Sequence, residues 1–377
     1  MLSILGKVTA CVVFLVCLVW YGQTNFYRDP GSVFFDQERA YETSYSDYRK
    51  NEARELIEWF SKGYETSPKD VRKKDKSLCV AFSSVKRQTQ YLPVTALHRQ
   101  DFLSADERED IHVSVLIAET NVTNHPNWNE PWLREAVDDA FTYEVNSTTM
   151  ASLREFEKKQ KYSEKGVFDY TYAMERCYDS GALYVGMFED DILLARGWLI
   201  KTIRGLGKIP VPDKNWLFMR LFNQERSTGF SSREIGDNNE FLIILGVGVG
   251  LSAVVLLARR RWRTTHRYLD LEALFVIVFL LVPGLVIFIY QSGKASIFPP
   301  SAGVFNEPFG CCSQAMIFPR TQIPLVVDSL RAKKHGQIDL MLDEIAATKN
   351  LDRYALYPVQ AQHIGAFKKT SNKFWDP

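Results

Sequence analysis

Three consecutive acids follow a short apolar segment in this sequence. Glu189, Asp190 and Asp191 come directly after residues 183–188, which have the composition of a buried strand. Neighbouring carboxylates at a dry strand end repel one another, and a divalent cation offsets that repulsion. Carboxylate oxygens favour Mg²⁺ or Mn²⁺ over zinc, and such an ion stabilises a departing diphosphate. The alternative is a solvated acidic turn capping a helix that begins near Leu193.

The segments around this cluster alternate between two kinds of pattern. Short apolar runs predict strands at residues 78–82, 111–118, 183–188, 216–222 and 315–318. Stretches with helical periodicity predict helices at residues 91–99, 168–180, 324–333 and 339–348. This alternation implies an α/β fold with a sheet of parallel strands, whose ligands bind beyond the carboxyl ends of the strands.

Three other segments are too long and too apolar to be ordinary core elements. Residues 8–21, 241–258 and 273–290 carry no charge. At about 1.5 Å of rise per residue, a span of 18 residues covers roughly 27 Å, which suits a thin bilayer. No small-residue cleavage site follows the first segment, which favours a retained signal anchor over a cleaved signal peptide. Buried soluble helices are the alternative for the other two segments.

Basic residues indicate how these spans are oriented. The loop at residues 259–272 contains five arginines, which places it in the cytosol, and Lys7 places the N-terminus there too. The resulting organisation is a cytosolic N-terminus (1–7), an anchor (8–21), a lumenal stem (22–76), a first domain half (77–240), two spans (241–258 and 273–290) around a cytosolic loop (259–272), and a second domain half (291–377).

Sequons, cysteines and net charge agree with this topology. Asn121 and Asn146 begin glycosylation sequons, which are used only in the lumen. Four of the six cysteines fall in the lumenal segments and allow three disulfide pairings, which stay open: Cys79, Cys177, Cys311 and Cys312. The net charge is +1, from 46 basic and 45 acidic residues, so nucleic acid is not an expected partner.

The motifs also resemble a known group of enzymes. The stretch YVGMFEDDILLARGWL (184–199) looks like the EDD segment of GT-A-fold glycosyltransferases, especially relatives of N-acetylglucosaminyltransferase IV. AFSSVKRQTQYL (81–92) resembles their nucleotide-binding start. A pair of membrane spans inside such a domain is similar to the post-GPI-attachment N-acetylgalactosaminyltransferase family, Golgi enzymes that add GalNAc to the GPI-anchor mannose. FGCCSQAMIFPR (309–320) and the later DLMLDE and QHIG segments also look like that family.

The resemblance implies roles for individual residues. Glu189 and Asp191 would hold Mn²⁺ or Mg²⁺. His363 is a further candidate for contacting the metal or the diphosphate, with a structural role as the alternative. The candidate donor-binding residues are Ser84, Val85, Lys86, Arg87, Glu189, Asp190, Asp191 and His363. For Ser84, Lys86 and Arg87 the alternative is a basic surface loop.

An inverting transferase also needs a general base beside the acceptor hydroxyl. In GT-A enzymes this base is commonly an acid at the start of a late helix, so Asp339, Asp343 and Glu344 are the candidates, each with a solvated helix charge as the alternative. The aromatic residues of 216–222, with Arg220, are candidates either for an acceptor pocket or for the core.

Together these observations predict a metal-dependent GT-A-type glycosyltransferase split by a tandem transmembrane hairpin and anchored in the Golgi membrane. It would transfer GalNAc from UDP-GalNAc to a GPI glycan, with inversion. Two alternatives remain open: an N-acetylglucosaminyltransferase-like enzyme acting on N-glycans or glycolipids, and a non-catalytic membrane scaffold that keeps the fold.

Overall fold

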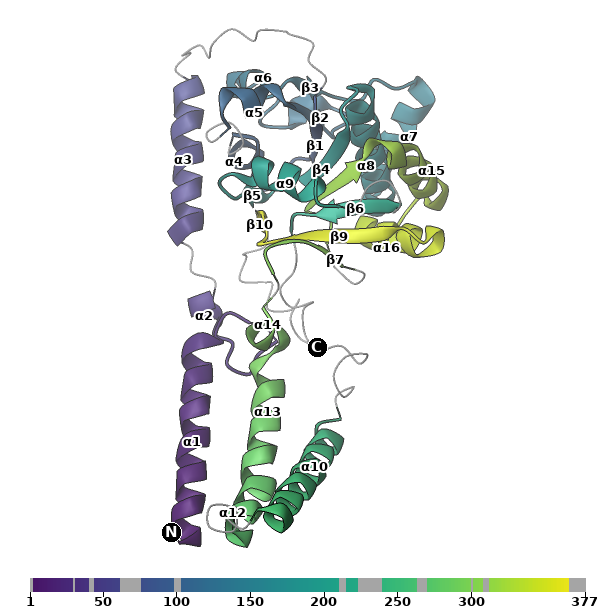
Figure 1. The fold of residues 1–377 in the computed structure, drawn as a ribbon. Helices are drawn as coiled ribbons and strands as arrows, with labels where there is room; N and C mark the ends of the chain where they lie inside the picture. Colours follow the sequence, from purple (N-terminus) through teal and green to yellow (C-terminus); the bar gives the residue numbers. More distant parts are fainter. Residues whose placement is uncertain are drawn as a thin grey trace. The chain divides into compact units, whose positions relative to one another are not determined.

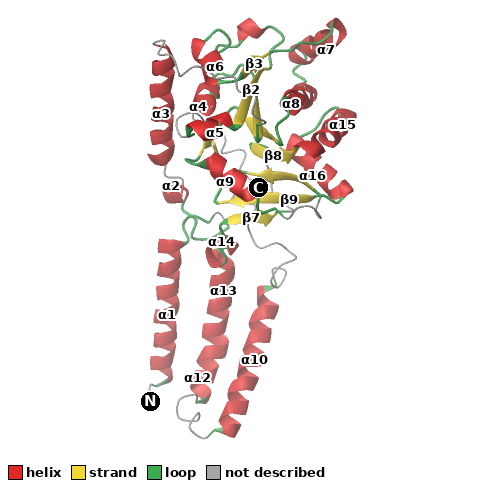
Figure 2. Cartoon of the chain, turned by 45° about the horizontal axis from the view of Figure 1, so that its top comes forward, coloured by secondary structure: helices red, strands yellow, loops and turns green. Residues whose placement is uncertain are grey.

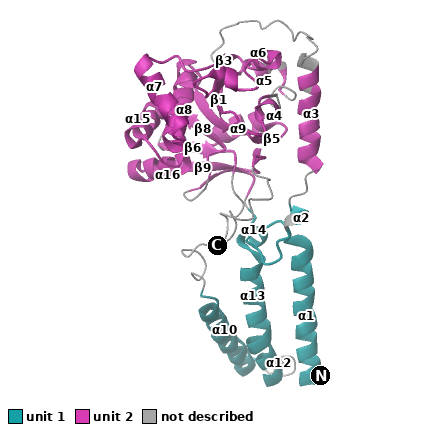
Figure 3. Cartoon of the chain, turned by 180° about the vertical axis from the view of Figure 1, so that it is seen from behind, with its two compact units in different colours: residues 1–42, 224–300 teal, residues 43–223, 301–377 magenta. Residues whose placement is uncertain are grey.

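The computed structural model of the 377-residue chain describes residues 3–29, 31–40, 44–61, 76–97, 103–209, 215–222, 239–262, 270–299, 301–307 and 312–365. The chain divides into two compact units (Figure 3). The first comprises residues 1–42 and 224–300, and the second comprises residues 43–223 and 301–377. Both units therefore combine segments that are far apart in the sequence.

The first unit is helical. Within the described residues, three helices are long and apolar enough to cross a membrane: Ile4–Asn25, Glu240–Arg261 and Leu271–Gln291 (Figure 2). The first two are α1 and α10. The third is built from α12 (Leu271–Val276), a π-helical turn (Ile277–Leu281) and α13 (Val282–Ser292), and short helices α2 (Gln37–Ala40) and α14 (Lys294–Ile297) complete the unit.

Ion pairs and close packing join α1 to the third apolar helix within the first unit. Lys7 of α1 forms ion pairs with Asp270 and, at 2.9 Å, with Glu272 at the start of α12. Gly284 of α13 packs so closely on Leu15 of α1 that a Cβ there would come within 2.7 Å of the leucine side chain. Much of the predicted basic loop, residues 263–269, lies outside the described residues.

The second unit contains an eight-stranded sheet in the order β3-β2-β1-β4-β8-β6-β9-β7. Its strands are β1 (Leu78–Ser84), β2 (Ile111–Ile117), β3 (Asp139–Phe141), β4 (Tyr184–Glu189), β6 (Trp216–Arg220), β7 (Gly303–Asn306), β8 (Ala315–Pro319) and β9 (Asp352–Tyr357). The expected α/β class with a large central sheet is confirmed.

The expectation of an all-parallel sheet is wrong. Strand β8 runs antiparallel to both β4 and β6, and β7 runs antiparallel to β9. Parallel neighbours require a crossover connection, usually a helix. Strand β8 instead comes from the second half of the chain and lies between two strands of the first half, so no such crossover links it to β4 or β6.

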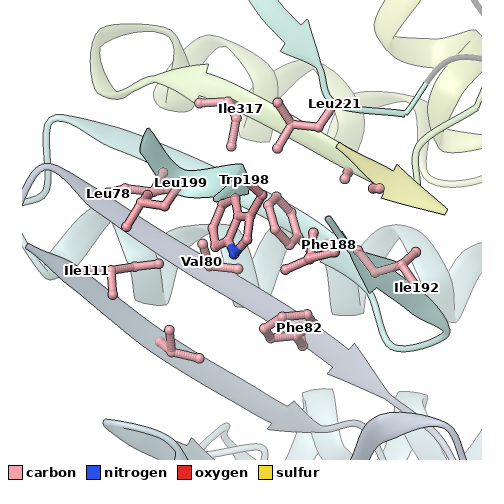
Figure 4. Close-up of a cluster of buried hydrophobic side chains, with 14 of the residues drawn as sticks. Leu78, Val80, Phe82, Ile111, Phe188, Ile192, Trp198, Leu199, Leu221 and Ile317 are labelled. Atoms are coloured by element: carbon pink, nitrogen blue, oxygen red, sulfur yellow. The ribbon is translucent and has the colours of Figure 1, made fainter. Parts of the chain in front are cut away.

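Helices cover both faces of this sheet (Figure 1). Alternate residues of β1 enter two separate hydrophobic clusters, because successive side chains of a strand point to opposite faces. Leu78, Val80 and Phe82 pack in the cluster shown in Figure 4. This cluster includes side chains of α4 (Leu92–Leu97), α6 (Pro131–Ala136) and α9 (Trp198–Leu206), and the other includes side chains of α7 (Ser147–Lys158), α8 (Tyr162–Asp179), α15 (Ile323–Lys333) and α16 (Ile338–Lys349).

Several smaller elements complete the second unit. Helix α3 (Ser44–Ser61) and the short α5 (Ala105–Glu109) belong to it, as do 3₁₀ turns at Val122–Asn124 and Arg320–Gln322. A second sheet has two strands, β5 (Ile192–Leu194) and β10 (Ala361–His363). The helix considered from the sequence near Leu193 is therefore a strand, and the next helix, α9, begins at Trp198.

A disulfide joins Cys79 of β1 to Cys177 of α8, with Cα atoms 5.5 Å apart. Cys11 and Cys17 in α1 are free thiols. Cys312 is also disulfide-bonded, and Cys311 lies outside the described residues.

Candidate active site

The three acids form a turn between β4 and β5, at the carboxyl end of β4. The backbone of the turn is held from both sides: Glu189 N–H donates to the Gln314 carbonyl at 2.9 Å, and Ile364 N–H donates to the Asp191 carbonyl at 2.9 Å. The Thr95 hydroxyl of α4 lies 2.8 Å from the Asp190 carbonyl oxygen. The acidic motif is thus a fixed turn and not a solvated loop.

Two of the three carboxyl groups are buried, and Glu189 is half-buried. Asp190 and Asp191 are only 1% and 3% exposed. Burial raises the pKa of Asp190 to about 6. Burial and the charge of Asp191 raise the pKa of Glu189. For Asp191, hydrogen bonds and charges from His363 and Arg87 outweigh the effect of burial and hold the pKa of this carboxyl below its ordinary value. The cluster therefore concentrates negative charge at Asp191.

His363 reaches this cluster through the two-stranded sheet. His363 pairs with Ile192 in the β10–β5 ladder, and its Nε2 lies 3.3 Å from Asp191 Oδ2. The ligand atoms of Glu189, Asp191 and His363 all lie within 4.8 Å of one another. Gly365 also belongs to this arrangement, because a Cβ on it would fall 2.1 Å from Asp191 Oδ2.

Several buried polar atoms around the acids lack a hydrogen-bond partner among the described residues. They include Asp191 Oδ1, Gln314 Oε1 and the hydroxyl of Tyr170. Burial, then the charge of Glu189, raises the pKa of Tyr170 well above its usual value. Buried polar atoms are nearly always satisfied in folded proteins, so this group indicates a place for a polar ligand, an ion or water.

The loop after β1 places a positively charged side chain, that of Arg87, beside the acids. Arg87 Nη1 lies 2.8 Å from Asp191 Oδ2, and its Nη2 lies 2.7 Å from Asp190 Oδ1. Lys86, by contrast, is exposed and donates its backbone N–H to Glu119 Oε1 at 2.7 Å. Val85 is partly buried against the core. The predicted loop thus lies at the acidic turn, with Arg87 as its direct contact.

Ser84, the last residue of β1, connects Asp190 to a histidine that sequence reasoning missed. Ser84 Oγ donates to Asp190 Oδ2 at 2.5 Å and lies 3.1 Å from His125 Nε2. Asn127 N–H donates to His125 Nδ1 at 3.3 Å, so the Nε2 proton of the neutral ring points to Ser84. Gln90 Nε2 lies 3.0 Å from the same hydroxyl. This buried chain of hydrogen bonds orients Asp190.

His125 makes the stability of this network depend on pH. Burial lowers the pKa of His125 to about 4 from an ordinary value of 6.5. The unfolded chain therefore binds more protons than the folded one between these values, and stability falls as the pH falls through this window. We expect the unfolding midpoint of the wild type to drop more between pH 7 and about pH 5 than that of His125→Gln.

Thermal unfolding of both proteins at the two pH values measures this difference. His335→Gln, which replaces an exposed histidine, is the matched control. If wild type and His125→Gln lose the same stability, His125 is not held neutral by its site.

The three candidate bases have different surroundings on α16. Asp343 Oδ1 pairs with Arg220 at 3.0 Å and with Arg353 at 3.1 Å. Glu344 is exposed and pairs with Lys333. Asp339, in the first turn of the helix, accepts the backbone N–H of Leu340 at 2.9 Å. Asp343 is therefore engaged by two guanidinium groups, whereas the contact of Asp339 within the described part of the chain is a local one to the backbone.

The remaining candidates are core or surface residues. Trp216, Phe218 and Arg220 of β6 are buried, and the two aromatic side chains belong to the hydrophobic clusters. Both sequon asparagines are exposed: Asn121 accepts a hydrogen bond from Thr123 Oγ1 at 2.7 Å, and Asn146 caps α7 by accepting Thr149 N–H at 2.8 Å. Each is accessible for modification.

Comparison with known proteins identifies the family. Residues 78–360, about three-quarters of the chain, match the family described as GPI-N-acetylgalactosamine transferase PGAP4. A search of curated proteins finds no match. The match includes β1, the acidic turn and α16, and it confirms the family expected from the sequence. The chain therefore belongs to the PGAP4 family of GPI-N-acetylgalactosamine transferases and is a membrane-associated glycosyltransferase.

Proposed function

We propose that this protein transfers GalNAc from UDP-GalNAc to a mannose of the GPI glycan, with inversion, at a metal-dependent site of GT-A type. The convergence of Glu189, Asp191 and His363 at the carboxyl end of β4 carries this proposal. The family match supports a sugar donor and a GPI-glycan acceptor. Two carboxylates and an imidazole within 4.8 Å of one another, with Asp191 Oδ1 buried and without a hydrogen-bond partner among the described residues, favour Mn²⁺ or Mg²⁺.

In this proposal Glu189, Asp191 and His363 are the metal ligands, and Asp190 faces the nucleotide. A bound cation would offset the charge that gathers on the diphosphate leaving group. Arg87, which lies on the same two aspartates, would turn to the phosphates when the donor binds, because guanidinium groups bind phosphate oxygens in a bidentate manner. Ser84 and His125 would hold Asp190 in place.

Asp339 is the proposed general base. A base must accept a proton at an oxygen that can reach the acceptor hydroxyl. Ion pairs occupy Asp343 and Glu344, which disfavours both of them. Asp339 lies at the start of α16, and this end of the helix faces the carboxyl ends of the strands, because the opposite end leads into the start of β9.

The proposed location is the Golgi membrane, with both halves of the second unit in the lumen. Five arginines in the last turn of α10 and the segment after it, the sequons and the Cys79–Cys177 disulfide support this orientation. Three spans would tie the enzyme to the bilayer that carries a lipid-linked acceptor.

Purified full-length protein in detergent, a panel of UDP-sugars and a GPI acceptor test this proposal. Transfer should occur from UDP-GalNAc, stop on chelation and return with Mn²⁺, and the anomeric configuration of the product should be inverted. Transfer from UDP-GlcNAc to N-glycans would instead favour the N-acetylglucosaminyltransferase-like alternative. Absence of turnover and of UDP-sugar binding would favour the scaffold.

A further inference from the structure

Helix α3 precedes the part of the chain that the family match covers, yet it is part of the second unit and packs on the rest of that unit. Ser46, Arg49 and Ala53 are 4%, 2% and 0% exposed, and Ile57 continues the same face against the hydrophobic core. These positions are spaced by three or four residues and form one helical face. Arginine is almost never fully buried unless it is paired, so this face has specific partners.

One partner is strand β10. Ser46 Oγ donates to Gln362 Oε1 at 2.7 Å. Gln362 lies between the other two residues of β10 and immediately precedes His363. The hydrogen bond from Ser46 of α3 thus holds β10, the strand that places His363 beside the acidic turn.

Strand β5 and the residues after it are the second partner. Arg49 Nη2 reaches the carbonyl oxygen of Leu194, the last residue of β5, at 3.5 Å, while its Nη1 pairs with Glu52 at 2.7 Å. Tyr45 accepts the backbone N–H of Arg196 at 3.2 Å. Helix α3 therefore contacts both strands of the small sheet.

The small sheet is short and is held by its surroundings: Ile192, Leu194 and Ala361 pack in the hydrophobic core, and the Thr95 hydroxyl lies 2.9 Å from the Ile192 carbonyl oxygen. Its ladder contains three residue pairs, from Ala361 and Leu194 to His363 and Ile192. A two-stranded ribbon is marginally stable alone and needs packing against another element. Asp191 immediately precedes β5 and His363 ends β10, so the geometry of this ribbon sets the distance between the two side chains.

We propose that α3 is a positioning element of the transferase site. It holds the β5–β10 ribbon so that Asp191 and His363 stay 3.3 Å apart. The catalytic relevance of this role rests on the proposed function of these two residues. The segment between the membrane anchor and the matched region is then part of the enzyme and not only a spacer.

Hydrogen–deuterium exchange of the full-length protein in detergent tests this role without depending on a bound metal. Arg49→Met removes the guanidinium and keeps an unbranched side chain. Exchange at residues 192–195 and 361–364 should become roughly tenfold faster, as expected for the loss of a hydrogen bond from a charged group. Exchange at 78–84 in β1 should not change. The Mn²⁺ concentration for half-maximal sugar transfer should rise in the same variant.

Arg54→Met is the matched control, because Arg54 is exposed on the same helix and contacts only Asn51 within the described residues. If Arg49→Met does not fold, the same exchange measurement on Ser46→Ala tests the proposal, because this change removes one hydrogen bond and no charge. Unchanged exchange in both strands, or equal acceleration in Arg54→Met, overturns the proposal. If the wild type transfers no sugar, the proposed function is wrong, and exchange still decides whether α3 holds the ribbon.

Discussion

Asp191→Asn should lower sugar transfer by at least about a hundredfold, the effect typical of removing one preorganised charge-stabilising group. Its Oδ2 contacts both Arg87 and His363, and its buried Oδ1 has no hydrogen-bond partner among the described residues. The amide keeps the shape of the side chain but removes its charge. Because His363 and Arg87 hold the pKa of Asp191 below its ordinary value, its charge also stabilises the fold, and the amide should lower the unfolding midpoint as well.

Initial transfer rates and Mn²⁺ titration calorimetry on the purified protein measure this effect. Asp179→Asn makes the same chemical change at an exposed position at the end of α8 and is the control. Wild-type transfer rates in Asp191→Asn would exclude this carboxylate from catalysis. Normal Mn²⁺ binding with lost transfer would show that Asp191 acts on the donor and not on the metal.

Replacing Cys79 and Cys177 together by alanine should destabilise the second unit by about 2–5 kcal/mol. The disulfide joins residues 98 positions apart, so it restricts a long loop in the unfolded chain. Both cysteines are fully buried, one in the central sheet and the other in α8. Their loss should therefore weaken the packing of α8 on β1 as well.

Chemical unfolding of the full-length protein, monitored by tryptophan fluorescence, measures this loss of stability. The double replacement of Cys11 and Cys17 by alanine is the control, because these thiols are free and lie in α1. An unchanged midpoint for Cys79→Ala with Cys177→Ala, or an equal shift in the control, would contradict the expected contribution of the cross-link.

The predicted strands that proved right share one property. Strands β1, β2, β4, β6 and β8 are almost wholly buried, so they read as continuous apolar runs. Strands β7 and β9 were not predicted, because both are partly exposed and β9 begins with Asp352 and Arg353. A search for continuous apolar runs detects fully buried strands and misses strands that are partly exposed.

The acidic motif could be predicted because its residues are consecutive, whereas its surroundings could not. His125 lies 41 residues from Ser84, and Gln90 meets both only after β1 and the following loop have folded. Gly365 is needed because a Cβ there would overlap the Asp191 carboxylate, and Asp191 is remote in sequence. The position of β8 between β4 and β6 likewise follows from tertiary pairing and not from local sequence.

The place of β8 has a consequence for biosynthesis. A ribosome completes β1 to β6 before either of the second and third spans, and β8 only after both. Until then β4 and β6 lack their shared neighbour, and the Gln314 and Ser313 contacts to Glu189 do not exist. The sheet of the nascent chain therefore stays open between β4 and β6 until the segment after the third apolar helix has been synthesised, and the acidic turn is completed only at that late stage.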